Sequence, residues 1–246
     1  MLVNISEHPV NVICDMAHGT RADRVRLIML PGAGDCAQDL VEHGFVRALR
    51  ARHLAVDAII IDARMDHYLE RCVSSLIKRH IEAPAGRTVV RTWLMGISLG
   101  GMGALDYVRE NGASIDGVIL LAPFLGTRGV IAEVMRAGGL LNWDPGAIGS
   151  ADDERRLLAW LRSYRPEVPG VPPLYLGYGT EDRYVAASLI LSRLVPSCNV
   201  VAIRGGHDWG TWLGAWERLL DRGVFSDETG SPRDASAPEQ PPKTER

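Results

Sequence analysis

Short apolar runs, each the length of one strand, alternate with helical patterns along most of this 246-residue chain. The runs that predict strands cover 25–30, 55–61, 89–95, 116–121, 173–176 and 199–203, and the helical patterns cover 36–50, 68–80, 102–108, 154–163, 185–194 and 211–220. Strands that alternate with helices of about ten residues are typical of a parallel sheet with right-handed crossovers and helices on both faces. The alternation therefore predicts an α/β fold with three layers, α/β/α, around a mostly parallel sheet.

Three segments lie outside this alternation. Residues 2–17 could supply an antiparallel hairpin at the edge of the sheet. Residues 125–171 are too long for a simple crossover. They follow the carboxyl end of a predicted strand, which is where a lid over an active site would lie. The alternative is a crossover helix with decorated loops. Residues 226–246 contain no aromatic or large aliphatic side chain, which predicts a disordered C-terminal tail. We therefore expect one domain over 1–225, with 125–171 as a candidate lid insertion.

Composition narrows the classes of function. The chain has 27 basic and 30 acidic residues and a net charge of -3, which gives no electrostatic case for binding nucleic acid or a membrane surface. The four cysteines are scattered without a C-x-x-C pair, and no set of His, Asp or Glu has metal-ligand spacing, so we expect no metal. No apolar run reaches the roughly 20 residues that span a bilayer, and the first residues lack a secretory pattern. These features predict a cytoplasmic protein.

A glycine-rich turn with a serine at its centre follows the third predicted strand. The sequence Gly96-Ile97-Ser98-Leu99-Gly100 lies between that apolar run and a helical pattern. In a strand–turn–helix context, G-x-S-x-G forms a sharp turn that exposes the serine hydroxyl as a nucleophile. Such a turn strains the serine backbone and requires glycine where strand and helix cross. Because a short glycine pattern also arises by chance in packing loops, the interpretation depends on finding a base, an acid and an oxyanion site elsewhere.

A candidate acid and a candidate base follow the last two predicted strands. Asp182 comes after the fifth strand and His207 after the sixth, so both would project from the same sheet edge as Ser98 in the order Ser, Asp, His. A serine needs an imidazole to accept its proton, and the imidazole needs a carboxylate that orients it and stabilises its charge. Glu181 and Asp208 are alternative acids. Both are weaker candidates than Asp182. Glu181 lies one residue nearer its strand, and Asp208 is adjacent to His207 in the sequence and cannot easily face the imidazole ring.

An oxyanion site completes the chemistry of acyl transfer. Negative charge develops on the carbonyl oxygen, and two fixed backbone N–H groups should meet it. One would come from Leu99, and the other from the glycine-rich loop after the first predicted strand, where Ala33 is the first candidate and Gly34 the second. The same glycines also allow a tight turn into the next helix, which we expect to begin with Asp35 as N-cap and Gln38 three residues on.

Over residues 25–224 the chain resembles the α/β-hydrolases. The segments that carry the resemblance are GISLGG (96–101), LPGAGD (30–35), GTED (179–182) and GGHDW (205–209). The resemblance implies a mostly parallel sheet of about eight strands, with Ser98 as nucleophile, His207 as base and Asp182 as the residue that orients it. Pro31 stands where many members carry histidine, and no HGGG segment is present. These departures speak against the lipase branch that uses HGGG and leave the substrate open.

The predicted function is that of a serine hydrolase without a cofactor, which cleaves a small or medium carboxylic ester through an acyl-enzyme on Ser98. Its expected partner is a small-molecule acyl substrate; the sequence does not determine the oligomeric state. A thioesterase, an acyltransferase or a small peptidase would use the same residues, because the fold does not fix the substrate. A non-catalytic binding protein of the same fold is the alternative from a different class. Such a protein would be expected to lack a triad member, and none is missing here.

Overall fold

The structure, a computed structural model of the chain, describes residues 10–18, 24–82 and 91–226. Within these residues a seven-stranded sheet has the order β1-β3-β2-β4-β5-β6-β7. The strands are β1 (Val12–Asp15), β2 (Val25–Leu30), β3 (Val56–Ile61), β4 (Arg91–Ile97), β5 (Gly117–Leu121), β6 (Leu174–Gly179) and β7 (Val200–Ile203). β1 runs antiparallel to β3, and the other neighbouring pairs are parallel. The carboxyl ends of β2 to β7 therefore lie at one edge of the sheet.

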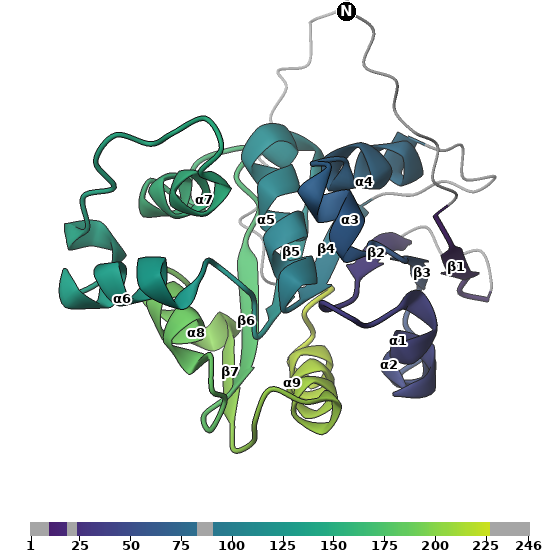
Figure 1. Cartoon of the computed structure of the whole chain (residues 1–246). Coiled ribbons are helices and arrows are strands. Elements are labelled where there is room, and N and C mark those ends of the chain that lie inside the picture. The colour runs from purple at the N-terminus through teal and green to yellow at the C-terminus, as the bar shows by residue number, and fades with distance from the viewer. Residues whose placement is uncertain (1–9, 19–23, 83–90, 227–246) are drawn as a thin grey trace, which may run out of the picture.

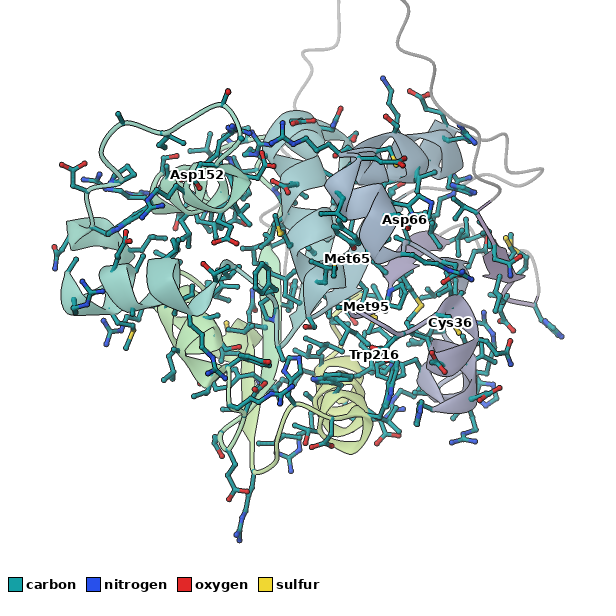
Figure 2. All side chains as sticks on the ribbon, in the orientation of Figure 1. Cys36, Met65, Asp66, Met95, Asp152 and Trp216 are labelled. Carbon is teal, nitrogen blue, oxygen red and sulfur yellow. The ribbon has the colours of Figure 1, made fainter. Side chains whose placement is uncertain are left out.

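Helices cover both faces of the sheet (Figure 1). They are α1 (Ala37–Glu42), α2 (Phe45–Ala51), α3 (Met65–Leu69), α4 (Val73–Glu82), α5 (Leu99–Asn111), α6 (Arg128–Arg136), α7 (Asp153–Arg162), α8 (Val185–Ser192) and α9 (Trp209–Asp221). One core joins α4 to α8 to one face. The other core joins α1, α2 and α9 to the opposite face, and it contains Met95 of β4 and Trp216 of α9, both labelled in Figure 2. The predicted three-layer α/β/α arrangement is confirmed.

The sheet has one strand fewer than the expected eight in the part of the chain that the structure describes. The segment before β2 contributes a single antiparallel strand, β1, which pairs with β3 along Val12 to Asp15. A hairpin over 2–17 would need a second strand, and residues 1–9 lie outside the described residues. The predicted tail also lies outside them, apart from Ser226. None of the helices described is both long and apolar enough to cross a bilayer.

Two predicted helices are each divided in the structure. The helix expected over 36–50 breaks at Gly44, whose φ of 91° is left-handed, to give α1 and α2. The helix expected over 68–80 breaks near Arg71, which has a φ of 56°, to give α3 and α4. The predicted cap at Asp35 is also wrong by one position. Cys36 is the N-cap of α1, and its N–H donates to the Asp39 carboxylate at 2.7 Å.

The segment 125–171 contains α6 and α7 and packs on the body of the domain. Helix α7 places Leu157, Leu158 and Leu161 in the same core as α5, and all three are 0% exposed. A pair of 2.6 Å hydrogen bonds from the Arg155 guanidinium to the Glu133 carboxylate joins α7 to α6. The two helices are therefore tied both to the core and to each other. The lid function of this segment stays a prediction.

Candidate active site

Ser98 lies in the sharp turn between β4 and α5. Its φ of 50° and ψ of -114° are strained values for a residue with a side chain. The turn is fixed on both sides, because the Ser98 N–H donates to the Leu121 carbonyl at 2.9 Å and the Ser98 carbonyl accepts from the Phe124 N–H at 2.8 Å. The end of β5 and the loop after it therefore hold the serine at the carboxyl edge of the sheet.

The glycines around Ser98 are required by close backbone contacts. A Cβ atom on Gly96 would lie 2.2 Å from the carbonyl oxygen of Gly100. A Cβ atom on Gly100 would lie 2.3 Å from the carbonyl oxygen of Leu30, at the end of β2. Both distances are far below van der Waals contact, so no other residue fits without moving backbone. The prediction that the crossing of strand and helix requires glycine at these two positions is confirmed.

The structure brings Ser98, His207 and Asp182 together in one chain of hydrogen bonds. The Nε2 atom of His207 lies 3.0 Å from the Ser98 hydroxyl oxygen, and its Nδ1 atom lies 2.7 Å from a carboxylate oxygen of Asp182. The other Asp182 oxygen accepts from the Tyr184 N–H at 2.7 Å, and Asp182 is only 4% exposed. This network assigns the Nδ1 proton to the bond with Asp182, which leaves the Nε2 lone pair facing the serine hydroxyl.

Neither alternative acid bonds to His207. Glu181 is exposed and forms an ion pair with Arg204, with an N–O distance of 2.8 Å. Asp208 is the N-cap of α9 and accepts from the Thr211 N–H at 2.9 Å. That hydrogen bond lowers the pKa of the Asp208 carboxyl below its ordinary value. Of the three acids weighed from the sequence, Asp182 is the one that lies against the imidazole.

The two segments that carry the candidate oxyanion donors lie next to Ser98. Leu99 is the first residue of α5, where backbone N–H groups have no partner within the helix. The loop that carries Ala33 and Gly34 passes beside the turn, since a Cβ atom on Gly32 would lie 3.6 Å from the Cβ of Ser98. Ala33 and Gly34 are exposed, and Gly34 has a left-handed φ of 83°. Two separate backbone segments, the start of α5 and the glycine-rich loop, thus border the serine.

Two aromatic side chains contact the imidazole edge-on. The ring of Trp212 lies 5.0 Å from the His207 ring at an interplanar angle of 90°, and the ring of Tyr184 lies 5.1 Å away at 81°. Trp212 belongs to the buried face of α9, and neither ring was among the residues predicted for the site. The one available signal for Tyr184 was its position two residues after Asp182. Edge contacts of this kind restrict rotation of the imidazole.

Asp35 is a further acidic group near the site, and the sequence predicted it only as a helix cap. Burial raises the pKa of its carboxyl, and the charge of Asp39 raises it further, while His207 and His43 lower it. A carboxylate oxygen of Asp35 would lie 2.6 Å from a Cβ atom on Gly32. Since Cys36 is the cap of α1, the Asp35 side chain is free to lie against the glycine-rich loop. It places a negative charge beside the glycine-rich loop whenever it is ionised.

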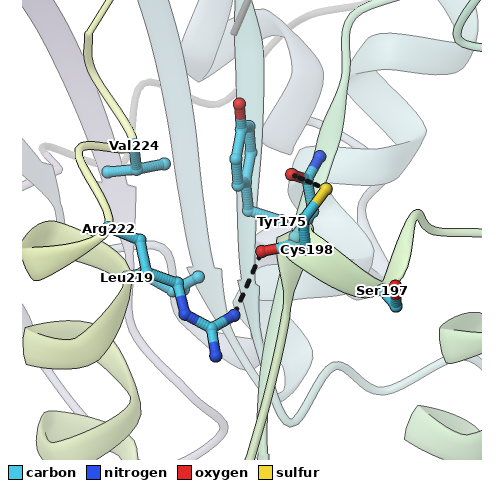
Figure 3. A pocket seen from close by; sticks show the side chains of 7 residues that line it. Tyr175, Ser197, Cys198, Leu219, Arg222 and Val224 are labelled. Atoms are coloured by element: carbon cyan, nitrogen blue, oxygen red, sulfur yellow. Dashed lines mark hydrogen bonds between the residues drawn. The ribbon is translucent and has the colours of Figure 1, made fainter.

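A cavity of about 500 Å³ lies at the other edge of the sheet (Figure 3). Its lining includes Tyr175 near the start of β6 and Cys198 just before β7, and none of the three residues of the hydrogen-bonded chain. The Arg222 guanidinium beside it donates to the carbonyls of Cys198 and Val200 at 3.0 and 2.8 Å. This cavity is therefore separate from the serine site. Within the described residues, no group of three or more His, Cys, Asp and Glu side chains is arranged to hold a metal ion.

Several solved structures are similar to this chain over most of its length. No protein-family model and no curated protein matches the sequence. Est1E from Butyrivibrio proteoclasticus is 18% identical with a TM-score of 0.58, over 87% of this chain and 95% of that one. A ferulic acid esterase is 16% identical with a TM-score of 0.60, over 88% and 99%. The fluorophosphonate-binding serine hydrolase FphF of Staphylococcus aureus is 15% identical with a TM-score of 0.61, over 88% and 92%. The chain has the α/β-hydrolase fold.

Proposed function

We propose that this protein is a serine hydrolase that cleaves a small or medium carboxylic ester through an acyl-enzyme on Ser98. The observation that carries the proposal is the chain of hydrogen bonds from the Ser98 hydroxyl through His207 to Asp182, with distances of 3.0 and 2.7 Å, at a strained turn. The same arrangement activates serine on several unrelated folds. The names of the structural neighbours, esterases and a serine hydrolase, support the same reaction.

The first half of the reaction forms the acyl-enzyme. The Ser98 oxygen attacks the ester carbonyl while His207 Nε2 takes the hydroxyl proton. Asp182 keeps the Nδ1 proton facing it and stabilises the imidazolium that forms. The carbonyl oxygen becomes an oxyanion, which the N–H of Leu99 and that of Ala33, or of Gly34, would stabilise. When the intermediate collapses, His207 returns the proton to the leaving alcohol, and the acyl group stays on the serine.

The second half of the reaction releases the acid. His207 takes a proton from a water molecule, which attacks the acyl carbonyl, and the same oxyanion donors stabilise the second intermediate. The proton then returns to the Ser98 oxygen as the carboxylic acid leaves. Throughout, Trp212 and Tyr184 hold the imidazole from its edges, so that Nε2 stays directed at the reacting oxygens. A thioester or an activated amide would follow the same steps, and an alcohol or amine in place of water would give acyl transfer.

A fluorophosphonate probe tests this proposal directly. The native protein should form a stable adduct at Ser98, because an activated serine attacks the phosphorus with loss of fluoride, and mass spectrometry of the peptides locates the adduct. Ser98→Ala should remove the labelling. Ser163→Ala, which changes an exposed serine at the end of α7, should leave it intact. Absence of an adduct on folded native protein, together with no turnover of p-nitrophenyl acetate, butyrate or octanoate, would favour the non-catalytic binding protein.

Replacing Ala33 with proline tests whether Ala33 or Gly34 supplies the second N–H to the oxyanion. Proline lacks the N–H, and loss of one oxyanion donor lowers kcat by about 100- to 1000-fold. Ala33→Ser keeps the N–H and should retain kcat within about threefold of the native protein. Steady-state kinetics on p-nitrophenyl butyrate measure both variants, and circular dichroism checks that each is folded. If folded Ala33→Pro also retains kcat within threefold, the second donor is Gly34 and Ala33 has no such role.

A further inference from the structure

Two arginines lie over the same aromatic ring beside the serine site. The guanidinium carbon of Arg183 lies 4.7 Å from the centre of the Tyr184 ring, and that of Arg128 lies 5.6 Å from it. The Tyr184 ring in turn contacts the ring of His207 at a centroid distance of 5.1 Å. Arg183 directly follows the candidate acid, while Arg128 begins α6, so distant parts of the chain bring two positive charges to one place.

These two charges have no acidic partner within residues 10–18, 24–82 and 91–226. Neither Arg128 nor Arg183 forms an ion pair there, and both are exposed. Other arginines differ, since Arg155 pairs with Glu133 and Arg204 pairs with Glu181. The pair over Tyr184 therefore keeps its full charge toward solvent.

The start of α6 adds to the positive potential of the pair. Arg128 is the first residue of α6, where the helix dipole contributes a partial positive charge. Glu154 keeps its negative charge near this end of the helix, where its carboxylate accepts from the N–H and the hydroxyl of Thr127 at 2.8 and 2.9 Å, but within the described residues it forms no ion pair with Arg128 or Arg183. When it is ionised, Asp35 places the opposite charge beside the glycine-rich loop. A negatively charged group on a bound substrate is thus repelled from the side of Asp35 and attracted to the side of Tyr184.

We infer that the ester cleaved at Ser98 carries an anionic group, a carboxylate or a phosphate, and that Arg128 and Arg183 bind it. This inference rests on the proposed hydrolase function. A guanidinium is planar, stays charged and can donate two parallel hydrogen bonds to a carboxylate or phosphate. Each guanidinium lies over the Tyr184 ring, so the ring holds both near His207 and the serine site. The anionic group can belong to the acyl part or to the alcohol part of the ester, and each recruits the same two side chains.

Three esters test the inference. The p-nitrophenyl monoester of glutaric acid carries a carboxylate on the acyl chain, 3-carboxy-4-nitrophenyl hexanoate carries it on the leaving group, and p-nitrophenyl hexanoate is neutral and of similar size. The native protein should prefer one of the two anionic esters in kcat/KM. In Arg128→Gln/Arg183→Gln that preference should fall about tenfold, mainly through KM, while turnover of the neutral ester stays within about twofold. Salt at about 0.5 M should weaken the preference of the native protein in the same direction.

Arg136→Gln is the control for Arg128, because it removes one arginine charge from the other end of α6. It should leave the preference for the anionic ester unchanged. If the native protein hydrolyses the neutral ester but prefers neither anionic one, or if the double variant keeps the preference, the inference is wrong and the hydrolase function stands. If no ester is turned over and no fluorophosphonate adduct forms, the hydrolase function itself fails. If the double variant loses the preference for the glutaric monoester, the acyl part of the substrate carries the charge. If it loses the preference for the carboxynitrophenyl ester, the alcohol part carries it.

Discussion

His207→Ala is expected to lower kcat for p-nitrophenyl butyrate by about 10⁶-fold, the loss seen when the histidine of such a triad is removed. Without the imidazole, no group lies at 3.0 Å from the Ser98 hydroxyl to take its proton. The remaining rate should come from the oxyanion donors and substrate binding alone. His53→Asn is the control, because His53 is exposed and its φ of 51° suits asparagine. This control should retain full activity.

The same prediction extends to the double variant. Ser98 and His207 act as one unit, so Ser98→Ala/His207→Ala should lose no more activity than either single variant. Two independent contributions would instead multiply to a far larger loss. Asp182→Asn should cost about 10⁴-fold, since it disturbs the tautomer of the imidazole without removing it. Losses that multiply, or a His207→Ala variant within tenfold of the native rate, would contradict a shared role for the three residues.

The layers of the fold could be predicted because each buried strand is a short apolar run with a clear end. The strand boundaries were less accurate where glycine interrupts such a run. The pattern ended the third strand at Met95, but β4 continues through Gly96 and Ile97, which pair with Leu120 and Leu121 of β5. Glycine is a poor strand residue in isolation, and here the neighbouring strand overrides that preference. Tertiary pairing of this kind has no local signal.

The candidate site could be predicted to the extent that it depends on chain order and strand ends. Ser98, Asp182 and His207 each follow a parallel strand, so their proximity follows from the topology. The contacts of Trp212 and Tyr184 with His207 depend instead on helix rotation and on side-chain rotamers, which no spacing rule gives. The start of α1 illustrates the same limit. Because Cys36 rather than Asp35 is the N-cap, the Asp35 carboxyl group does not cap the helix and lies against the glycine-rich loop.

Gly96→Ala is expected to destabilise the protein by about 3 kcal/mol or more, at the upper end of the range for overpacked sites. The new methyl group would lie 2.2 Å from the oxygen, 2.3 Å from the carbonyl carbon of Gly100 and 2.5 Å from the nitrogen of Gly101. All three are backbone atoms, so no change of side-chain rotamer relieves the contact. The first turn of α5 must move away from β4, and Ser98, which lies between them, must move as well.

Gly129→Ala is the matched control for this substitution. Gly129 lies in α6, its φ is outside the left-handed region, and a Cβ atom there has nothing within 4 Å. Alanine should therefore stabilise the protein there, by up to about 1 kcal/mol, because it restricts the unfolded chain and favours the helix. Urea unfolding of both variants measures the contrast. If Gly96→Ala unfolds with a free energy within about 1 kcal/mol of the native protein, the backbone contact is not as close as described, and the serine does not depend on it.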